Sequence, residues 1–429
     1  MWGRASDGRT VPPSHSARIA VILSFLGLIL VLVLSSSAAS PIRGAQSGVG
    51  RPLAQPYANS TQTTPTGPPN ALVRSINLTR SPNTVNPYDI VYDPVNGMVY
   101  MSNVSRNLIE VQAASMRLMP PINIGAYSAG LAFDSLNGFL YVTGSFMENV
   151  TTVVNTATNA VVARIPTSVR PWGIAYDSQN QLLYVADLLS NNVSVISGSS
   201  NSVVATIPVG NWPMQVTFDP VNGDIYVTNT ASSNVSVISG ATNKVVATVP
   251  VTLGQAIGIA ANSVNGDVYV SSNCPNGVTL INGSTNRVTG FISTGESYFT
   301  GGCLNAQEYD TSSVAVLEPF RLLYVTDAFS GSVSIINETS QSVLSTVQVG
   351  PYPVRMALDP ADSLLFVSKY GSTNLSVLGP APAIPTSPSG PTVNYLGASA
   401  SQWFTVWVAT LLVATASVIL WRVRKRRAA

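Results

Sequence analysis

Residues 217–229 read TFDPVNGDIYVTN, and close variants return as YDPVNGMVYMSN at 92–103 and YDSQNQLLYVAD at 176–187. The aromatic residue of this phrase marks seven copies, separated by 41, 43, 42, 43, 55 and 42 residues: Tyr100, Tyr141, Tyr184, Tyr226, Tyr269, Tyr324 and Phe366. A period near 42 residues is typical of β-propeller blades. The chain of 429 residues is therefore predicted to hold one large repeat domain rather than several average ones.

Each copy divides into four short segments that suit β-strands. In the copy around Tyr226 these are residues 214–218, 224–229, 234–239 and 244–250. Branched and aromatic residues fill the segments, and Gly, Asn, Asp, Ser and Pro fill the gaps between them. Apolar residues occur on both faces of a segment, as blades stacked on both sides require. The prediction is an all-β, seven-bladed propeller with four-stranded blades.

The two ends of the repeat region indicate how the ring closes. The last copy ends near residue 378 after three strands, and a lone segment upstream, residues 72–78, matches the fourth-strand pattern. An open ring would leave two strand edges unpaired. We therefore expect the N-terminal strand to complete the last blade.

The repeat phrase also resembles a known family. IYVTN at 225–229, NVSVIS at 234–239 and NKVVATVPV at 243–251 look like the YVTN family of β-propeller repeats, known from archaeal surface-layer proteins and related bacterial exported proteins. The resemblance covers residues 71–378. It implies the fold strongly and the activity weakly, because one propeller fold hosts many functions.

Both ends of the chain point to export. Arg4, Arg9 and Arg18 precede an apolar run at 19–34 and small residues at 35–40, which predicts a secretory signal over 1–39, with an uncleaved N-terminal anchor as the alternative. Residues 403–420 carry no charge and are followed by a basic cluster. This pattern predicts a single transmembrane helix over 402–422 and a cytoplasmic tail over 423–429.

The remaining segments complete the predicted layout, which places the propeller, 71–378, outside the cell. Residues 40–70 read as a linker rich in Pro, Ser and Thr, and residues 379–401 as an extended Pro-rich stalk. Residues 40–401 hold 13 basic and 18 acidic residues, a net charge of about −5. No basic patch for nucleic acid is present.

The sequence lacks several kinds of catalytic and metal site. Its one histidine, His15, precedes the first apolar run, which excludes histidine metal sites and His-dependent triads from the extracellular part. We expect no cofactor and no metal. The repeated Asp and Asn, as at Asp219 and Asn222, do not have the ligand spacing of a calcium loop, but they suit a tight turn before glycine.

An insertion accounts for the long fifth interval, between Tyr269 and Tyr324. Glu296, Glu308 and Asp310 lie in it, at 296–313, and paired carboxylates could hydrolyse saccharides or lactones; an ordinary solvated loop is the alternative.

Cys274 and Cys303 fall in loops on the same expected face. A disulfide between them is predicted outside the cell, with two free thiols as the alternative.

Aromatic residues recur at the start of the first strand of several blades. They are Tyr88, Tyr127, Trp172, Trp212 and Tyr352, with Arg170, Gln215 and Arg355 as polar neighbours. In a closed ring these residues are expected to encircle the mouth of the central channel. They could stack on sugar rings or clamp a peptide there, or could only cap the core between blades.

Nine Asn-x-Ser/Thr sequons are candidates for glycosylation: Asn59, Asn77, Asn103, Asn149, Asn192, Asn234, Asn282, Asn337 and Asn374.

Taken together, the sequence predicts a membrane-anchored cell-surface protein that binds a glycan, a protein or a surface layer without catalysis. The alternative is an extracellular, carboxylate-dependent hydrolase or lactonase that acts on saccharides.

Overall fold

The computed structural model describes residues 3–4, 10–11, 67–79, 86–103, 105–144, 148–251, 255–273, 276–295 and 313–380. The first two pieces, β1 (Gly3–Arg4) and β2 (Thr10–Val11), pair with each other in a separate unit. The expected signal core, the transmembrane segment, the cytoplasmic tail and the stalk from residue 381 onward lie outside the described residues, whereas Gly379, expected to begin the stalk, ends a strand. Among the residues that are described, no helix is long and apolar enough to cross a membrane.

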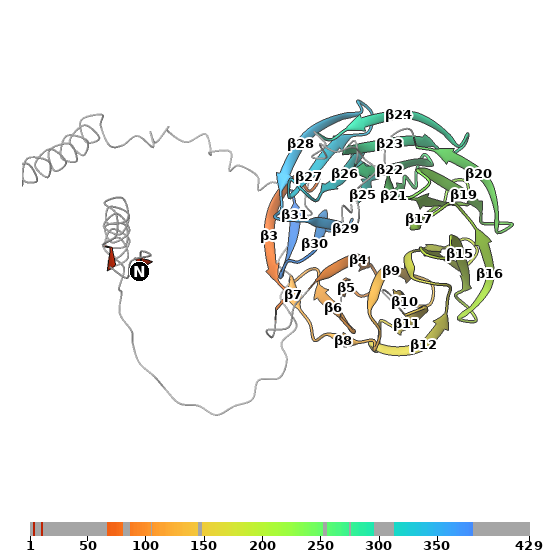
Figure 1. Cartoon of the computed structure of the whole chain (residues 1–429), viewed down its shortest axis with the longest axis horizontal. Coiled ribbons are helices and arrows are strands. Elements are labelled where there is room, and N and C mark those ends of the chain that lie inside the picture. The colour runs from red at the N-terminus through yellow and green to blue at the C-terminus, as the bar shows by residue number, and fades with distance from the viewer. Residues whose placement is uncertain are drawn as a thin grey trace, which may run out of the picture. The chain divides into compact units, whose positions relative to one another are not determined.

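The described residues between 67 and 380 form seven antiparallel sheets arranged as a ring, which confirms the predicted seven-bladed propeller (Figure 1). Blade 1 comprises β4 (Pro87–Asp93), β5 (Met98–Asn103), β6 (Asn107–Gln112), β7 (Arg117–Leu118) and β8 (Ile122–Asn123). Blade 2 comprises β9 (Ser128–Asp134), β10 (Phe139–Gly144), β11 (Val150–Asn155) and β12 (Ala160–Pro166). Blade 3 comprises β13 (Pro171–Asp177), β14 (Leu182–Asp187), β15 (Asn192–Ser197) and β16 (Ser202–Pro208).

Blade 4 comprises β17 (Pro213–Asp219), β18 (Asp224–Asn229), β19 (Asn234–Ser239) and β20 (Lys244–Pro250). Blade 5 comprises β21 (Ala256–Ala261), β22 (Asp267–Asn273), β23 (Asn276–Asn282) and β24 (Arg287–Ser293). Blade 6 comprises β25 (Val314–Leu317), β26 (Leu322–Asp327), β27 (Ser332–Asn337) and β28 (Ser342–Gln348). In each blade the first strand lies toward the ring axis and the fourth lies on the outer rim (Figure 1).

Blade 7 joins the two ends of the repeat region. Its strands follow the order β29 (Pro353–Asp359), β30 (Leu364–Lys369), β31 (Asn374–Gly379) and β3 (Ala71–Asn77). The strands β3 and β31 are antiparallel, with Ala71 opposite Gly379 and Asn77 opposite Asn374. The predicted closure by the N-terminal strand is thus confirmed.

Two blades depart from the common pattern for local reasons. Pro120 and Pro121 separate β7 from β8, because proline has no backbone N–H to donate to β6 and divides the outer strand of blade 1. In blade 6, Leu317 stands where other copies have Asp or Asn. A short 3₁₀ turn, η2 (Glu318–Phe320), joins the first two strands there.

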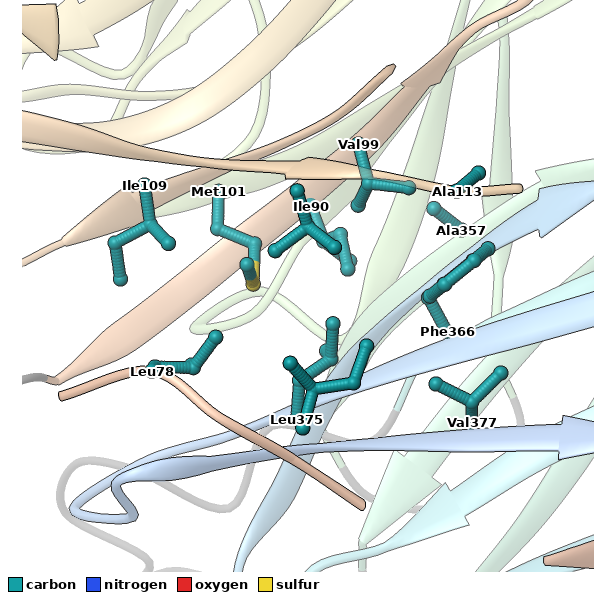
Figure 2. Close-up of a cluster of buried hydrophobic side chains, with 12 residues drawn as sticks. Leu78, Ile90, Val99, Met101, Ile109, Ala113, Ala357, Phe366, Leu375 and Val377 are labelled. Carbon is teal, nitrogen blue, oxygen red and sulfur yellow. The ribbon is translucent and has the colours of Figure 1, made fainter. Parts of the chain in front are cut away.

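The hydrophobic core is divided into clusters that lie between neighbouring blades. Figure 2 shows the cluster that closes the ring, where Phe366 and Leu375 of blade 7 pack with Ile90 and Met101 of blade 1. All seven marker aromatics of the repeat are almost completely buried in such clusters. Full burial of a large apolar side chain stabilises a fold by about 1.5–3 kcal/mol. The regular spacing of the marker aromatic along the chain therefore reflects the packing between blades.

Candidate functional site

The repeated acidic turn is structural. Asp219 Oδ1 accepts a hydrogen bond from Val221 N (2.9 Å), and Asn222 Oδ1 accepts one from Asp224 N (2.8 Å). Gly223 follows with φ +76°, a conformation that glycine adopts without strain. Asp93, Asp134, Asp177, Asn262 and Asp359 make the equivalent first bond. The predicted turn is confirmed, and these side-chain oxygens serve the hairpin between the first and second strands.

The marker tyrosine connects neighbouring blades through its hydroxyl group. Tyr226 OH donates to Asn286 Oδ1 (2.9 Å), a residue of the next blade. Tyr141 and Tyr184 bond in the same way to Asn201 and Asn243. The Asn acceptors all have positive φ in the turn before a fourth strand. This residue therefore belongs to the scaffold and not to a ligand site.

A hydroxyl group in the second strand also bridges adjacent blades, and sequence reasoning missed it. Thr228 Oγ1 accepts from Gln215 N (3.0 Å) and donates to Ile257 O (3.0 Å) of blade 5. Thr143 likewise accepts from Gly130 N (2.7 Å) and donates to Trp172 O (2.6 Å). The sequence carried a signal, since six of the seven copies have Ser or Thr two residues after the marker aromatic.

These hydroxyl bridges fix the first strands where the candidate aromatics lie. Each bridged strand has a register shift near its start, for example between Pro213 and Val216, so its first residues leave the regular pleat. A β-bulge of this kind redirects side chains and is common near binding sites. The scaffold therefore holds the starts of neighbouring first strands in fixed relation.

Tyr88 and Trp172 meet although their blades are not neighbours. Tyr88 belongs to β4 of blade 1 and Trp172 to β13 of blade 3, yet Trp172 Nε1 donates to Tyr88 OH at 3.1 Å. Their rings make an edge contact, with centroids 5.2 Å apart and planes at 72°. Blade 2, which lies between them, has Ala129 at the corresponding position, and its Gly130 packs so closely that an added Cβ would lie 2.2 Å from Trp172 O.

Two arginines extend this contact. Arg355 Cζ lies 5.5 Å from the ring centroid of Tyr88, and Arg170 Cζ lies 5.3 Å from that of Trp172. Arg355 Nε is 3.9 Å from Asp89 Oδ1. We refer to Tyr88, Asp89, Arg170, Trp172 and Arg355 as the arginine–aromatic cluster. Four of them were predicted site residues, and Asp89 was not.

Burial governs the ionisation of the cluster. It raises the pKa of the Asp89 carboxyl, against the opposing influence of Arg355 and of two backbone N–H groups. It also raises the pKa of Tyr88, again opposed by Arg355. Tyr88 is thus a neutral phenol at physiological pH, and the cluster combines two cations with one carboxyl group.

Several donors of this region lack a partner within the described part of the chain. They are Arg355 Nε and Nη2, Arg170 Nε and Gln215 Nε2, and all four atoms are buried. Gln215 lies beside the backbone of blade 3, because a Cβ added to Gly173 would approach its Cδ to 3.2 Å. Buried polar groups are nearly always bonded, so unpaired donors are characteristic of a site that receives acceptors.

The other predicted aromatics are exposed. Tyr127 is 38% exposed, Trp212 49% and Tyr352 50%. Tyr127 contacts Arg106, whose Cζ lies 5.4 Å from the ring centroid. The structure therefore divides the expected ring of aromatics into a contacting pair, Tyr88 and Trp172, and three exposed side chains.

Trp212 and Tyr352 share an unusual backbone conformation. Their φ angles are 55° and 49°, and Arg170, at the same repeat position, has 59°. Positive φ is a genuine outlier for bulky residues. At Trp212 it is held by two bonds: Trp212 N donates to Asn191 Oδ1 (3.0 Å) and Trp212 O accepts from Thr230 N (3.0 Å). Such imposed strain is found preferentially at functional sites.

The remaining predicted residues are distributed as follows. Cys274, Cys303, Glu296, Glu308, Asp310 and Asn59 lie outside the described residues. Among the sequons, Asn77 and Asn149 are exposed, and Asn192, Asn234, Asn282, Asn337 and Asn374 are partly exposed. Asn103 is 7% exposed, and both ends of its amide are bonded, to Asn86 N (2.7 Å) and Ser105 Oγ (3.0 Å).

Comparison with known proteins supports the fold and no more. No family model matches the chain, and no curated protein matches it. Among solved structures, hydrazine synthase of Kuenenia stuttgartiensis is 18% identical with a TM-score of 0.60, over 71% of this chain and 98% of that one. The structure of U3-55K is 13% identical with a TM-score of 0.60, over 73% and 100%. At these identities the likeness shows a β-propeller alone.

Proposed function

We propose that the chain is a membrane-anchored, extracellular binding protein that holds a glycan at the face where the first strands begin, without catalysing a reaction. The observation that carries the proposal is the pair Trp212 and Tyr352. Each exposes about half of a large aromatic side chain, and each is held in a strained backbone conformation. Aromatic rings stack on sugar rings and supply contact area at low entropic cost.

The proposed location rests on the sequence of the two ends. The basic, apolar and small segments at 1–39 support secretion, and the apolar run at 403–420 with its basic tail supports a C-terminal anchor. Surface labelling of intact cells tests this part. Reagents that do not cross membranes are expected to modify the propeller, and labelling only after lysis would contradict the proposal.

A glycan array with the purified full-length chain tests the binding role. Trp212→Ala and Tyr352→Ala are each expected to weaken glycan binding about two- to tenfold, because each removes one stacking contact. Phe320→Ala is the matched control, since Phe320 is also exposed (37%) but lies at the turn between the first and second strands, at the other end of the blade. Equal losses in all three variants would contradict the proposal.

A second candidate role, lateral assembly in a surface layer, is supported by the outer rim. The strands β16 (SVVATIP) and β28 (SVLSTVQ) carry no charge, and they expose Val204 (55%) and Leu344 (57%). Edge strands without charged residues favour pairing with another chain. Self-association of the purified chain, measured by sedimentation, is expected to be lost in a Val204→Lys, Leu344→Lys variant. A monomeric parent protein would refute this role.

A further inference from the structure

We infer that the arginine–aromatic cluster is a carboxylate subsite, so that the bound glycan is acidic and carries a uronic acid. This inference rests on the proposed glycan-binding function and narrows it to a ligand class. It comes from features that the exposed aromatics do not share: burial, charge and unpaired donors.

The first step is the unpaired state of Arg355. The residue is 4% exposed, and its Nε and Nη2 atoms have no hydrogen-bond partner among the described residues. Its one contact of this kind is Nη1 with the carbonyl of Val354, at 3.5 Å. Asp89 Oδ1 lies 3.9 Å from Nε and balances part of the charge, but buried donors that make no hydrogen bond are destabilising, which points to a ligand acceptor for them.

Asp89 forms an ion pair with Arg355 but does not accept a hydrogen bond from Nε or Nη2. Asp89 Oδ2 accepts from Leu131 N (2.8 Å) and Oδ1 accepts from Ile90 N (2.9 Å), so the carboxyl is committed to the backbone. Its distance of 3.9 Å from Arg355 Nε is too long for a hydrogen bond. Arg355 Nε and Nη2 therefore have no hydrogen-bond acceptor among the described residues, while Asp89 lowers the net charge of the cluster.

The charge balance favours a single negative charge on the ligand. Arg170 lies over the Trp172 ring and Arg355 over the Tyr88 ring, and Asp89 lies 3.9 Å from Arg355 Nε; with Asp89 ionised, these groups carry a net charge of about +1. A carboxylate carries one negative charge, whereas a phosphate monoester carries about −1.5 to −2 at neutral pH. The planar guanidinium also matches a carboxylate with two parallel N–H bonds.

The neighbouring groups suit the rest of an acidic sugar. Gln215 Nε2 is a buried donor without a partner and could bond a ring or hydroxyl oxygen. Trp172 and Tyr88 hold both arginines by their ring faces and are themselves fixed by the bond of 3.1 Å between them. A preorganised cluster of this kind loses little entropy when a ligand binds.

The probes for the test are oligosaccharides of galacturonic, glucuronic and mannuronic acid. Each is paired with its methyl ester, which keeps the shape and removes the charge. Calorimetry with the purified full-length chain is expected to show tighter binding of at least one acid than of its ester, on the order of tenfold or more. Peptides with a free and an amidated C-terminus form a second pair, and a carboxylate preference confined to the peptides would overturn the inference.

The variants separate the two proposals. Arg170→Gln and Arg355→Lys are each expected to lower the ratio of acid to ester affinity from on the order of tenfold to about one. Because Arg355 is buried, thermal unfolding checks that variant, and Arg170, which is partly exposed, provides the test if Arg355→Lys fails to fold. Arg287→Gln, the same change on the outer strand β24, should keep the preference.

The outcomes are distinct. Equal binding of acid and ester by the parent protein, or an unchanged preference in Arg170→Gln, overturns the carboxylate subsite and leaves glycan binding in place. Absence of binding to every oligosaccharide, acidic or neutral, overturns the proposed function itself and the inference with it.

Discussion

Asp187 offers a quantitative test of the repeat architecture. This residue is fully buried at the end of β14, where its Oδ2 accepts from Ser194 Oγ (2.7 Å) and its Oδ1 has no partner among the described residues. Blade 4 has Asn229 at the same position, and its Nδ2 donates to Asn234 Oδ1 (2.8 Å) and Ser236 Oγ (2.9 Å). Asp187→Asn would supply the donor that blade 3 lacks.

The magnitude follows from the ionisation of the carboxyl. Burial raises the pKa of Asp187 from 3.8 to about 7, although bonds from Ser194 partly oppose it. A raised pKa means that stability is complete below pH 3.8 and is lost as pH rises to about 7, because the unfolded chain ionises first. At about 1.4 kcal/mol per pH unit, the loss reaches about 4 kcal/mol.

Denaturant unfolding of the full-length chain measures the effect. Asp187→Asn is expected to raise the free energy of unfolding relative to the parent protein, and this gain should grow by about 3 kcal/mol between pH 5 and pH 8. The reverse exchange in blade 4, Asn229→Asp, is the control and should lower stability more at pH 8 than at pH 5. A gain for Asp187→Asn that is the same at both pH values would refute the reasoning.

Two further pairs of substitutions test the contacts between blades by thermal unfolding. Tyr226→Phe removes a hydroxyl that is bonded to the next blade and should lower the free energy of unfolding by about 1–2 kcal/mol. Tyr324→Phe should be neutral or stabilising, because the buried Tyr324 hydroxyl has no partner among the described residues. Equal losses of stability in the two variants would contradict the interpretation. Thr228→Val should destabilise the protein by about 1–2 kcal/mol, because it loses the hydrogen bond to blade 5. Ala186→Ser should stabilise it by about 1 kcal/mol, because it adds the hydroxyl bridge that blade 3 lacks. Stability losses in both variants would count against the bridging role.

The sequence predicts those features of the fold that depend on local chemistry. Gly223 and Asn222 favour one turn wherever they occur, and the spacing of the tyrosines repeats because each blade needs one. The closing strand could be predicted from the missing fourth strand of the last copy. Each of these inferences uses residues close together in the chain.

The candidate site depends on relations that one repeat does not contain. Tyr88 bonds Trp172 across the intervening blade, whose Gly130 lies against the Trp172 backbone, and the two aromatics are 84 residues apart. The unpaired state of Arg355 likewise depends on the bonds that Asp89 makes with the backbone of another strand. A pattern search within repeats finds the residues but not these contacts, because each contact joins different copies.

The pairing of β3 with β31 has a mechanical consequence. The beginning of β3 and the end of β31 lie side by side, and Asn70 N donates to Gly379 O at 3.0 Å. Tension applied to the propeller through both ends would pull these two strands apart from that corner. Antiparallel strands loaded in this way break their hydrogen bonds one after another, whereas strands loaded along their length share the force among all of them. Blade 7 would therefore open at low force and release the ring.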